Sequence, residues 1–178
     1  KGVYAHCRRA GAMESRFKIL GHPVHPMLIV FPLGLFIAGL FFDIIHLITG
    51  SSTWAQVAYW DIIVGVVMGL VAALPGFVDW LAVPSGTRAK SLGALHGLGN
   101  VVVVVLFLVS WLLRTGSSDH APSGLSVALE VIAILIGAVT AWIGGELVYR
   151  LGVGVDRDAG LDASSSLSGR GRAGTGSR

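Results

Sequence analysis

Two histidines in this sequence lie where apolar segments begin, and their type and spacing suit the binding of a metal ion or a haem. His25 belongs to the motif GHPVHP at 21–26, and His96 opens the motif HGLGN at 96–100. Imidazole is a common ligand of zinc, copper, iron and haem iron. The glycines around His96 would leave room for a flat macrocycle. We therefore predict that His25 and His96 bind one haem b or one metal ion.

Further polar residues are expected close to these two ligands, where they would orient them by hydrogen bonds. They are His22, Asp79, Asn100 and Glu146. Asn100 follows His96 by four residues, so the two side chains share one face of a helix. Asp79 is expected to pair with Arg88 or Lys90. Glu146 precedes Arg150 by four residues, which is the spacing of a helical ion pair.

Other readings of the same polar residues stay open. They would be purely structural if they lie near the membrane interface and join helix ends, because long polar side chains reach water cheaply there. A transporter would use a relay of His, Asp and Glu, but that needs polar groups at the bilayer midplane. The centres of the apolar segments carry none, which argues against a pore. The serines cluster in connections and in the tail, so no nucleophilic triad is visible, and we expect no catalytic activity.

Composition decides the surroundings of these residues. Of the 178 residues, 53% are apolar and 13% are charged, whereas a soluble domain carries about 25% charged residues. The mean hydropathy is +0.75. These values exclude a soluble enzyme, a disordered chain and a nucleic-acid-binding protein. The single cysteine, Cys7, excludes an internal disulfide and a thiolate metal cluster.

Four apolar segments are long enough to cross a bilayer as helices. A crossing helix needs about 20 residues, and the candidates run over about 27–48, 59–83, 92–113 and 125–149. The connections are short and rich in turn residues, so consecutive helices should be antiparallel neighbours. We predict an all-α membrane protein, an antiparallel four-helix transmembrane bundle.

Basic residues predict the orientation of this bundle. Twelve of the 13 Lys and Arg fall on the side of the two termini, and Arg114 alone falls on the other side. Because positive loops remain in the cytoplasm, both termini should be cytoplasmic. The protein would then be a multi-pass protein of the bacterial cytoplasmic (inner) membrane, with the two histidines near its cytoplasmic face. A thinner polar layer at the outer ends comprises Asp43, His46, Asp61 and Glu130.

The two ends of the chain are expected to lie outside the membrane domain at 13–156. The segment from Met13 resembles a natural start, so residues 1–12 are interpreted as an upstream or non-native segment. Residues 157–178 are of low complexity and are predicted to form a disordered cytoplasmic tail.

Several motifs together resemble one family of small bacterial membrane proteins. The chain resembles the domain-of-unknown-function 2231 (DUF2231) family in GHPVHPMLIVFPLGLF, FFD, LPGFVDW, the His96–Asn100 pair and GGELVYRLGVGVD. The resemblance implies a four-helix integral membrane protein without an assigned activity, and it supplies no residue roles. It also implies an association with redox proteins such as Rieske and cytochrome c domains. The expected partners are the lipid bilayer and redox proteins or other membrane subunits, with oligomerisation left open.

Overall fold

The computed structural model describes residues 12–168, and this part of the chain is predominantly helical. A short β-hairpin precedes the helices, and a single π-helical turn follows the last of them. The elements are β1 (Lys18–Ile19), β2 (His22–Pro23), α1 (Val24–Leu28), α2 (Val30–Thr49), α3 (Ser52–Ala82), α4 (Arg88–Leu113), α5 (Gly124–Gly145) and η1 (Glu146–Arg150).

Four helical segments are long and apolar enough to cross a membrane, as the sequence predicts. They comprise Val24–Thr49, Ser52–Ala82, Arg88–Leu113 and Gly124–Arg150. The main differences from the prediction are earlier starts. The first helix begins at Val24 because Pro26 falls in its first turn, where a missing N–H is harmless. The α4 helix begins at Arg88 because the Thr87 side chain caps it by accepting from the backbone N–H of Lys90 at 3.2 Å.

Proline also explains the break between α1 and α2. Pro32 has no N–H to donate to the carbonyl of Leu28, and α1 ends at Leu28. The chain nevertheless continues in the same direction, because Ile29 keeps helical dihedral angles and donates to the carbonyl of His25 at 3.1 Å. The two helices therefore form one span.

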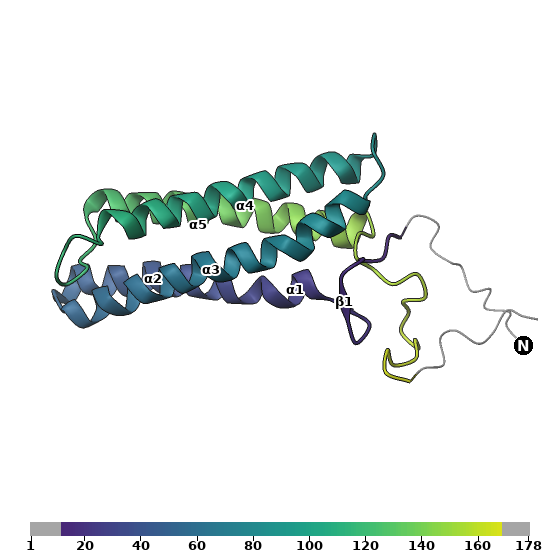
Figure 1. Ribbon diagram of the computed structural model, residues 1–178, viewed down its shortest axis with the longest axis horizontal. Helices are drawn as coiled ribbons and strands as arrows, with labels where there is room; N and C mark the ends of the chain where they lie inside the picture. Colours follow the sequence, from purple (N-terminus) through teal and green to yellow (C-terminus); the bar gives the residue numbers. More distant parts are fainter. Residues whose placement is uncertain (1–11, 169–178) are drawn as a thin grey trace, which may run out of the picture.

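Consecutive spans are antiparallel (Figure 1). The packing is most extensive between α2 and α3 and between α4 and α5. The β-hairpin, the α3–α4 connection and residues 151–168 lie together at one end of the bundle, which we call the tail end. The α2–α3 and α4–α5 connections lie at the opposite end, which we call the Arg114 end. Both ends of the described chain are thus on the same side, as an even number of spans requires.

The buried core is small and lies between the two helix pairs. Phe36 of α2 and Phe107 of α4 stack with their ring centroids 4.0 Å apart. Gly65 of α3 permits this approach, because a Cβ there would meet the ring of Phe36 at 2.8 Å. Ile62, Val66, Val103 and Ala133 complete the buried cluster.

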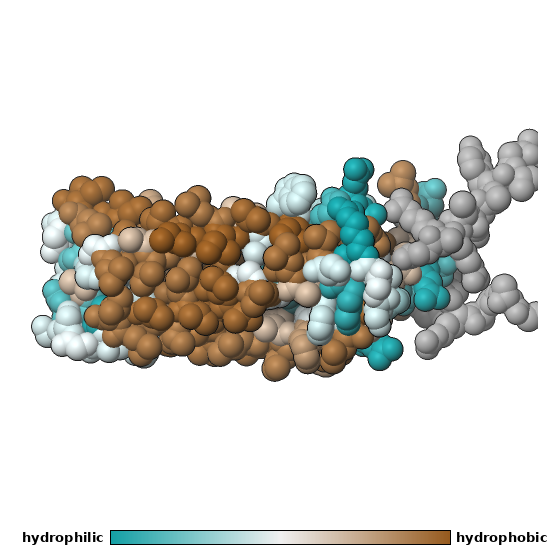
Figure 2. Space-filling view, turned by 90° about the horizontal axis from the view of Figure 1, so that it is seen from above, coloured by the Kyte–Doolittle hydropathy of each residue, from teal (hydrophilic) through white to brown (hydrophobic). Residues whose placement is uncertain are grey.

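Most of the apolar side chains face outward instead of into this core. Figure 2 shows a broad hydrophobic surface along the middle of the visible face, with hydrophilic residues gathered towards the ends. Large exposed apolar surfaces of this kind are not tolerated in water. The fold is therefore that of an integral membrane protein whose outer surface faces lipid.

Candidate functional site

His25 is held at the start of α1 by a hydrogen bond to a neighbouring span. Its Nδ1 lies 2.8 Å from the carbonyl oxygen of Ala72 in α3. Pro75 falls inside this turn of α3, where its missing N–H disturbs the helical hydrogen bonding. Gly76 is adjacent, and a Cβ on it would lie 2.8 Å from His25 Nδ1. The absence of a side chain at this position is therefore what admits the imidazole.

His96 is held by α5 in the same manner. Its Nδ1 lies 2.9 Å from the carbonyl oxygen of Thr140. Its Nε2 accepts a hydrogen bond from Nδ2 of Asn100 at 3.1 Å, and Oδ1 of Asn100 accepts from the Thr140 hydroxyl at 2.9 Å. A Cβ on Gly144 would lie 3.1 Å from the His96 ring, so glycine again provides the space.

The structure brings these two histidines together across the bundle. Their ring centroids are 6.3 Å apart and the ring planes are inclined by 86°. Because each Nδ1 faces a carbonyl oxygen, which can only accept, Nδ1 is the ring atom that donates to the backbone in both histidines. A histidine that ligates a metal is usually oriented in this way. The arrangement is therefore a pair of imidazoles, one held by α3 and the other by α5, each through its Nδ1.

The pair lies deeper in the bundle than the sequence indicates. Because α4 begins at Arg88, His96 lies about 12 Å along the helix at a rise of about 1.5 Å per residue. Asn100 falls near the middle of this 26-residue helix and contacts Thr140 of α5. The expectation that all span centres are apolar is therefore wrong. The polar layer reaches from the tail end to mid-span.

Of the expected supporting residues, Asn100 alone contacts the pair among the described residues. His22 is exposed on the β-hairpin, with its Nε2 3.3 Å from the hydroxyl of Ser166. Glu146 pairs with Arg88 at 2.8 Å, while its expected partner Arg150 is 4.0 Å away. His22 and Glu146 therefore make their contacts at the tail end of the bundle and not with the histidine pair.

Asp79 has partners other than those expected. Its carboxylate accepts from the hydroxyl of Ser15 at 2.6 Å and from the backbone N–H of Arg16 at 2.7 Å. A third, longer contact comes from the N–H of Phe17 at 3.4 Å. The predicted pairing with Arg88 or Lys90 is therefore wrong. The Ser15 hydroxyl and the backbone N–H of Arg16 occupy the carboxylate oxygens. Lys90 lies over the ring of Trp80, with its Nζ 3.9 Å from the ring centroid.

The donor set favours haem over a hydrated or tetrahedral metal ion. The described residues contain no group of three or more His, Cys, Asp or Glu side chains that could hold a metal ion. Structural zinc sites need four such ligands, and catalytic zinc sites need three. Two imidazoles, in contrast, could together hold one haem iron. The residues present therefore fit a haem b and do not fit zinc.

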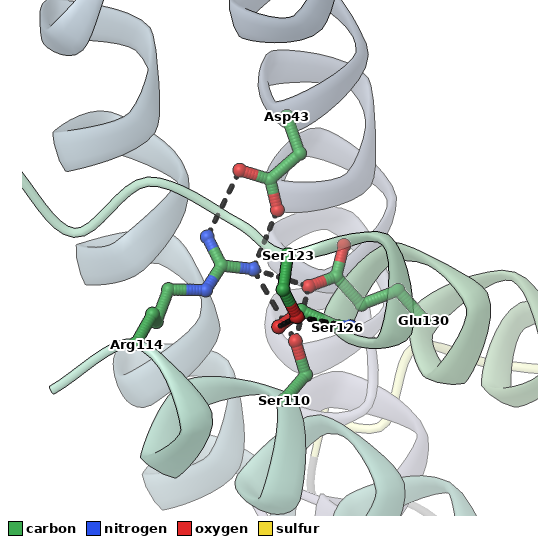
Figure 3. A network of polar contacts seen from close by, with 6 residues as sticks. All are labelled: Asp43, Ser110, Arg114, Ser123, Ser126 and Glu130. Carbon is green, nitrogen blue, oxygen red and sulfur yellow. Dashed lines mark hydrogen bonds and ion pairs between the residues drawn. The ribbon is translucent and has the colours of Figure 1, made fainter. Parts of the chain in front are cut away.

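A second polar cluster at the Arg114 end is fully buried (Figure 3). The Arg114 guanidinium makes two parallel bonds to Asp43, from Nη1 to Oδ1 at 2.9 Å and from Nη2 to Oδ2 at 2.6 Å. The same Nη2 also donates to Glu130. Ser110 donates to Glu130 at 2.5 Å and accepts from Arg114 at 3.3 Å. This cluster joins α2, α4 and α5.

Sequence reasoning missed this cluster, although a signal was present. In the sequence, Arg114 is the single basic residue predicted on its side. Asp43 and Glu130 lie inside apolar segments at the same end, where a buried carboxylate needs a cation. Arg114 directly follows α4 and lies four residues after Ser110, so it could be assigned to the same level of the bundle.

A comparison with protein families agrees with these structural features. The model of the predicted membrane protein family DUF2231 matches residues 21–157. The match covers more than three quarters of the chain, which therefore belongs to the DUF2231 family of predicted membrane proteins. It includes His25, His96 and the entire Arg114 cluster. No curated protein and no solved structure matches the chain.

Proposed function

We propose that this protein is a redox-associated membrane module that binds one haem b between His25 and His96. The observation that carries this proposal is the pair itself, in which the ring centroids are 6.3 Å apart and each Nδ1 faces a backbone carbonyl oxygen. The proposed module has no catalytic activity of its own. It would work with redox proteins or other membrane subunits in the same bilayer.

The anchoring of both rings supports ligation, because it fixes the tautomer before a ligand arrives. The carbonyls of Ala72 and Thr140 accept from Nδ1–H of His25 and His96 respectively. Nε2 is therefore the ring atom of each histidine that would bind iron. Gly76 and Gly144 have no side chain at the points where the two rings pack against the backbone, so both imidazoles can take up these positions. The site is therefore preorganised from four different helices.

A bound haem would supply reversible one-electron chemistry. The chain's own residues would hold the macrocycle and exclude water from it. Nε2 of His96 accepts from Nδ2 of Asn100 at 3.1 Å, so this hydrogen bond would have to open for His96 to hold iron. Asn100 would keep its second bond, in which Oδ1 accepts from the Thr140 hydroxyl at 2.9 Å.

We also propose that the tail end faces the cytoplasm of a bacterial inner membrane. The predicted excess of Lys and Arg at this end supports it. Arg114, the single basic residue at the other end, is 1% exposed and bonded to Asp43. Its charge is therefore neutralised inside the bundle. The difference in exposed positive charge between the two ends is then larger than the number of Lys and Arg in the sequence indicates.

The proposal is tested by purifying the protein in detergent from haem-replete cells. Absorption spectra of the oxidised and reduced protein would be recorded together with a metal analysis. We expect a Soret band that shifts on reduction and iron as the bound metal. A colourless preparation without metal would contradict the proposal.

A structural subunit without cofactor is the second candidate, and one observation favours it. His96, Asn100 and Thr140 form a chain of hydrogen bonds that needs no ligand to complete it. In this case the pair would join α1, α3, α4 and α5 and nothing more. A colourless protein whose unfolding temperature falls on His96→Ala would support this second candidate.

A further inference from the structure

Glu130 lies at the centre of the Arg114 end with one carboxylate oxygen bonded and the other without a partner. Its side chain is 0% exposed. Oε1 accepts from Ser110 and from Arg114. Oε2 has no hydrogen-bond partner among the described residues, and the dashed contacts in Figure 3 reach only one of the two oxygens. The second oxygen is thus buried without a donor.

The charges of the cluster do not balance if both carboxylates are ionised. Arg114 brings one positive charge, and its two parallel bonds to Asp43 already match it with one negative charge. An ionised Glu130 would leave one uncompensated negative charge inside the bundle. Burying an unpaired charge is so unfavourable that the group is neutralised instead, and two carboxylates at one site seldom ionise together.

No other group near the cluster supplies the missing positive charge within the described part of the chain. His120 turns Nδ1 to the backbone oxygen of Arg114 at 3.3 Å, and its ring stacks on Tyr59 of α3 at 3.9 Å. On α5 itself, the nearest polar side chain one turn back is Ser126, which bonds to Ser123 at 2.9 Å. His46, one turn after Asp43 on α2, has its Nδ1 2.9 Å from the backbone oxygen of Ser51. None of these hydrogen bonds reaches a side chain of the cluster.

We propose that Glu130 is a proton-binding site inside the membrane domain. In the folded protein its carboxyl group is the neutral acid with the proton on Oε2, and Arg114 is balanced by Asp43 alone. Proton release converts this acid to a carboxylate that must then compete with Asp43 for the same guanidinium. The ligand of this second site is therefore a proton, and its occupancy is coupled to the Arg114–Asp43 pair.

Infrared spectroscopy tests this assignment on the full chain in detergent at neutral pH. A protonated carboxyl group gives a C=O stretching band that ionised carboxylates lack. We expect one such band in the wild type and its loss in Glu130→Gln. Labelling all glutamates of the wild type with carbon-13 should shift the band. This second measurement does not depend on whether Glu130→Gln folds. The chain has only two other glutamates, Glu14 and Glu146, and both are ion-paired.

Two aspartate variants test the coupling. In Asp43→Asn the guanidinium has Glu130 as its only carboxylate, so Glu130 should ionise and the band should disappear. Asp61→Asn removes a partly exposed carboxylate and should leave the band unchanged. The proposal is overturned if the wild type has no such band or if the band does not shift with labelled glutamate. A band that persists in Asp43→Asn would overturn the coupling.

Discussion

Arg114 and Asp43 meet side by side although 71 residues separate them in the sequence. Both side chains are almost completely buried, with 1% and 0% exposure. The two parallel bonds join the end of α4 to α2, and Glu130 adds α5. Arg114, Asp43 and Glu130 therefore link three spans at the Arg114 end.

Arg114→Ala should destabilise the protein strongly. It leaves the Asp43 carboxylate buried without a cation, and breaking a buried ion pair costs about 3–5 kcal/mol. Asp43→Ala should cost less, because Glu130 can take its place. The measurement is the free energy of unfolding in detergent. Arg150→Ala is the control, since this side chain is 78% exposed and should change stability by less than about 0.5 kcal/mol. Equal effects at all three positions would contradict the cluster's role.

Gly76→Ala should displace His25. The new Cβ would lie 2.8 Å from Nδ1, so the ring must leave the carbonyl of Ala72. We expect a loss of stability of about 1–3 kcal/mol, as for other overpacked sites, and a loss of haem from the purified protein. Gly34→Ala is the matched control, because a Cβ there meets nothing within 4 Å. If Gly76→Ala binds haem like the wild type, the two-histidine site is wrong.

The proposed orientation can be tested by cysteine labelling in intact cells. Cys7 is the single natural cysteine, so a Cys7→Ser background removes the competing thiol. Ser118→Cys in the α4–α5 connection should react with a thiol reagent that does not cross the inner membrane. Ser85→Cys in the α3–α4 connection should react only after the cells are broken. The reverse pattern would contradict the orientation.

Asp79→Ala should release the segment that precedes the β-hairpin. Its carboxylate is the acceptor for the Ser15 hydroxyl and the N–H of Arg16, and Ser15 is only 5% exposed. Trypsin should then cut after Arg16 and Lys18 several times faster, as followed by mass spectrometry. Asp158→Ala, in an exposed segment, provides the control. Unchanged cleavage would show that other contacts hold the segment.

The spans could be predicted from the sequence because lipid imposes a length and a polarity that are visible locally. The sequence predicts that His25 and His96 lie at the same depth in the bundle. It does not predict that their rings are neighbours, because the choice of adjacent helices depends on packing. Asp79 and Arg114 show why the rest could not be predicted. Asp79 accepts from backbone N–H groups, which no side-chain pattern reveals. Arg114 follows the last residue of α4, but its side chain is buried in the bundle and not exposed in the α4–α5 connection. Of the predicted terminal segments, residues 1–11 and 169–178 fall outside the described residues.

The most direct test of the two-histidine haem site is the amount of haem bound per chain in a set of histidine variants. His25→Ala and His96→Ala should each lose the haem. His46→Ala should retain it, because His46 bonds to the carbonyl of Ser51 at 2.9 Å in the α2–α3 connection, and so should His22→Ala on the exposed hairpin. We expect one haem per chain in the wild type, in His46→Ala and in His22→Ala. Wild-type protein without haem, or haem retained in His25→Ala and His96→Ala, would contradict it.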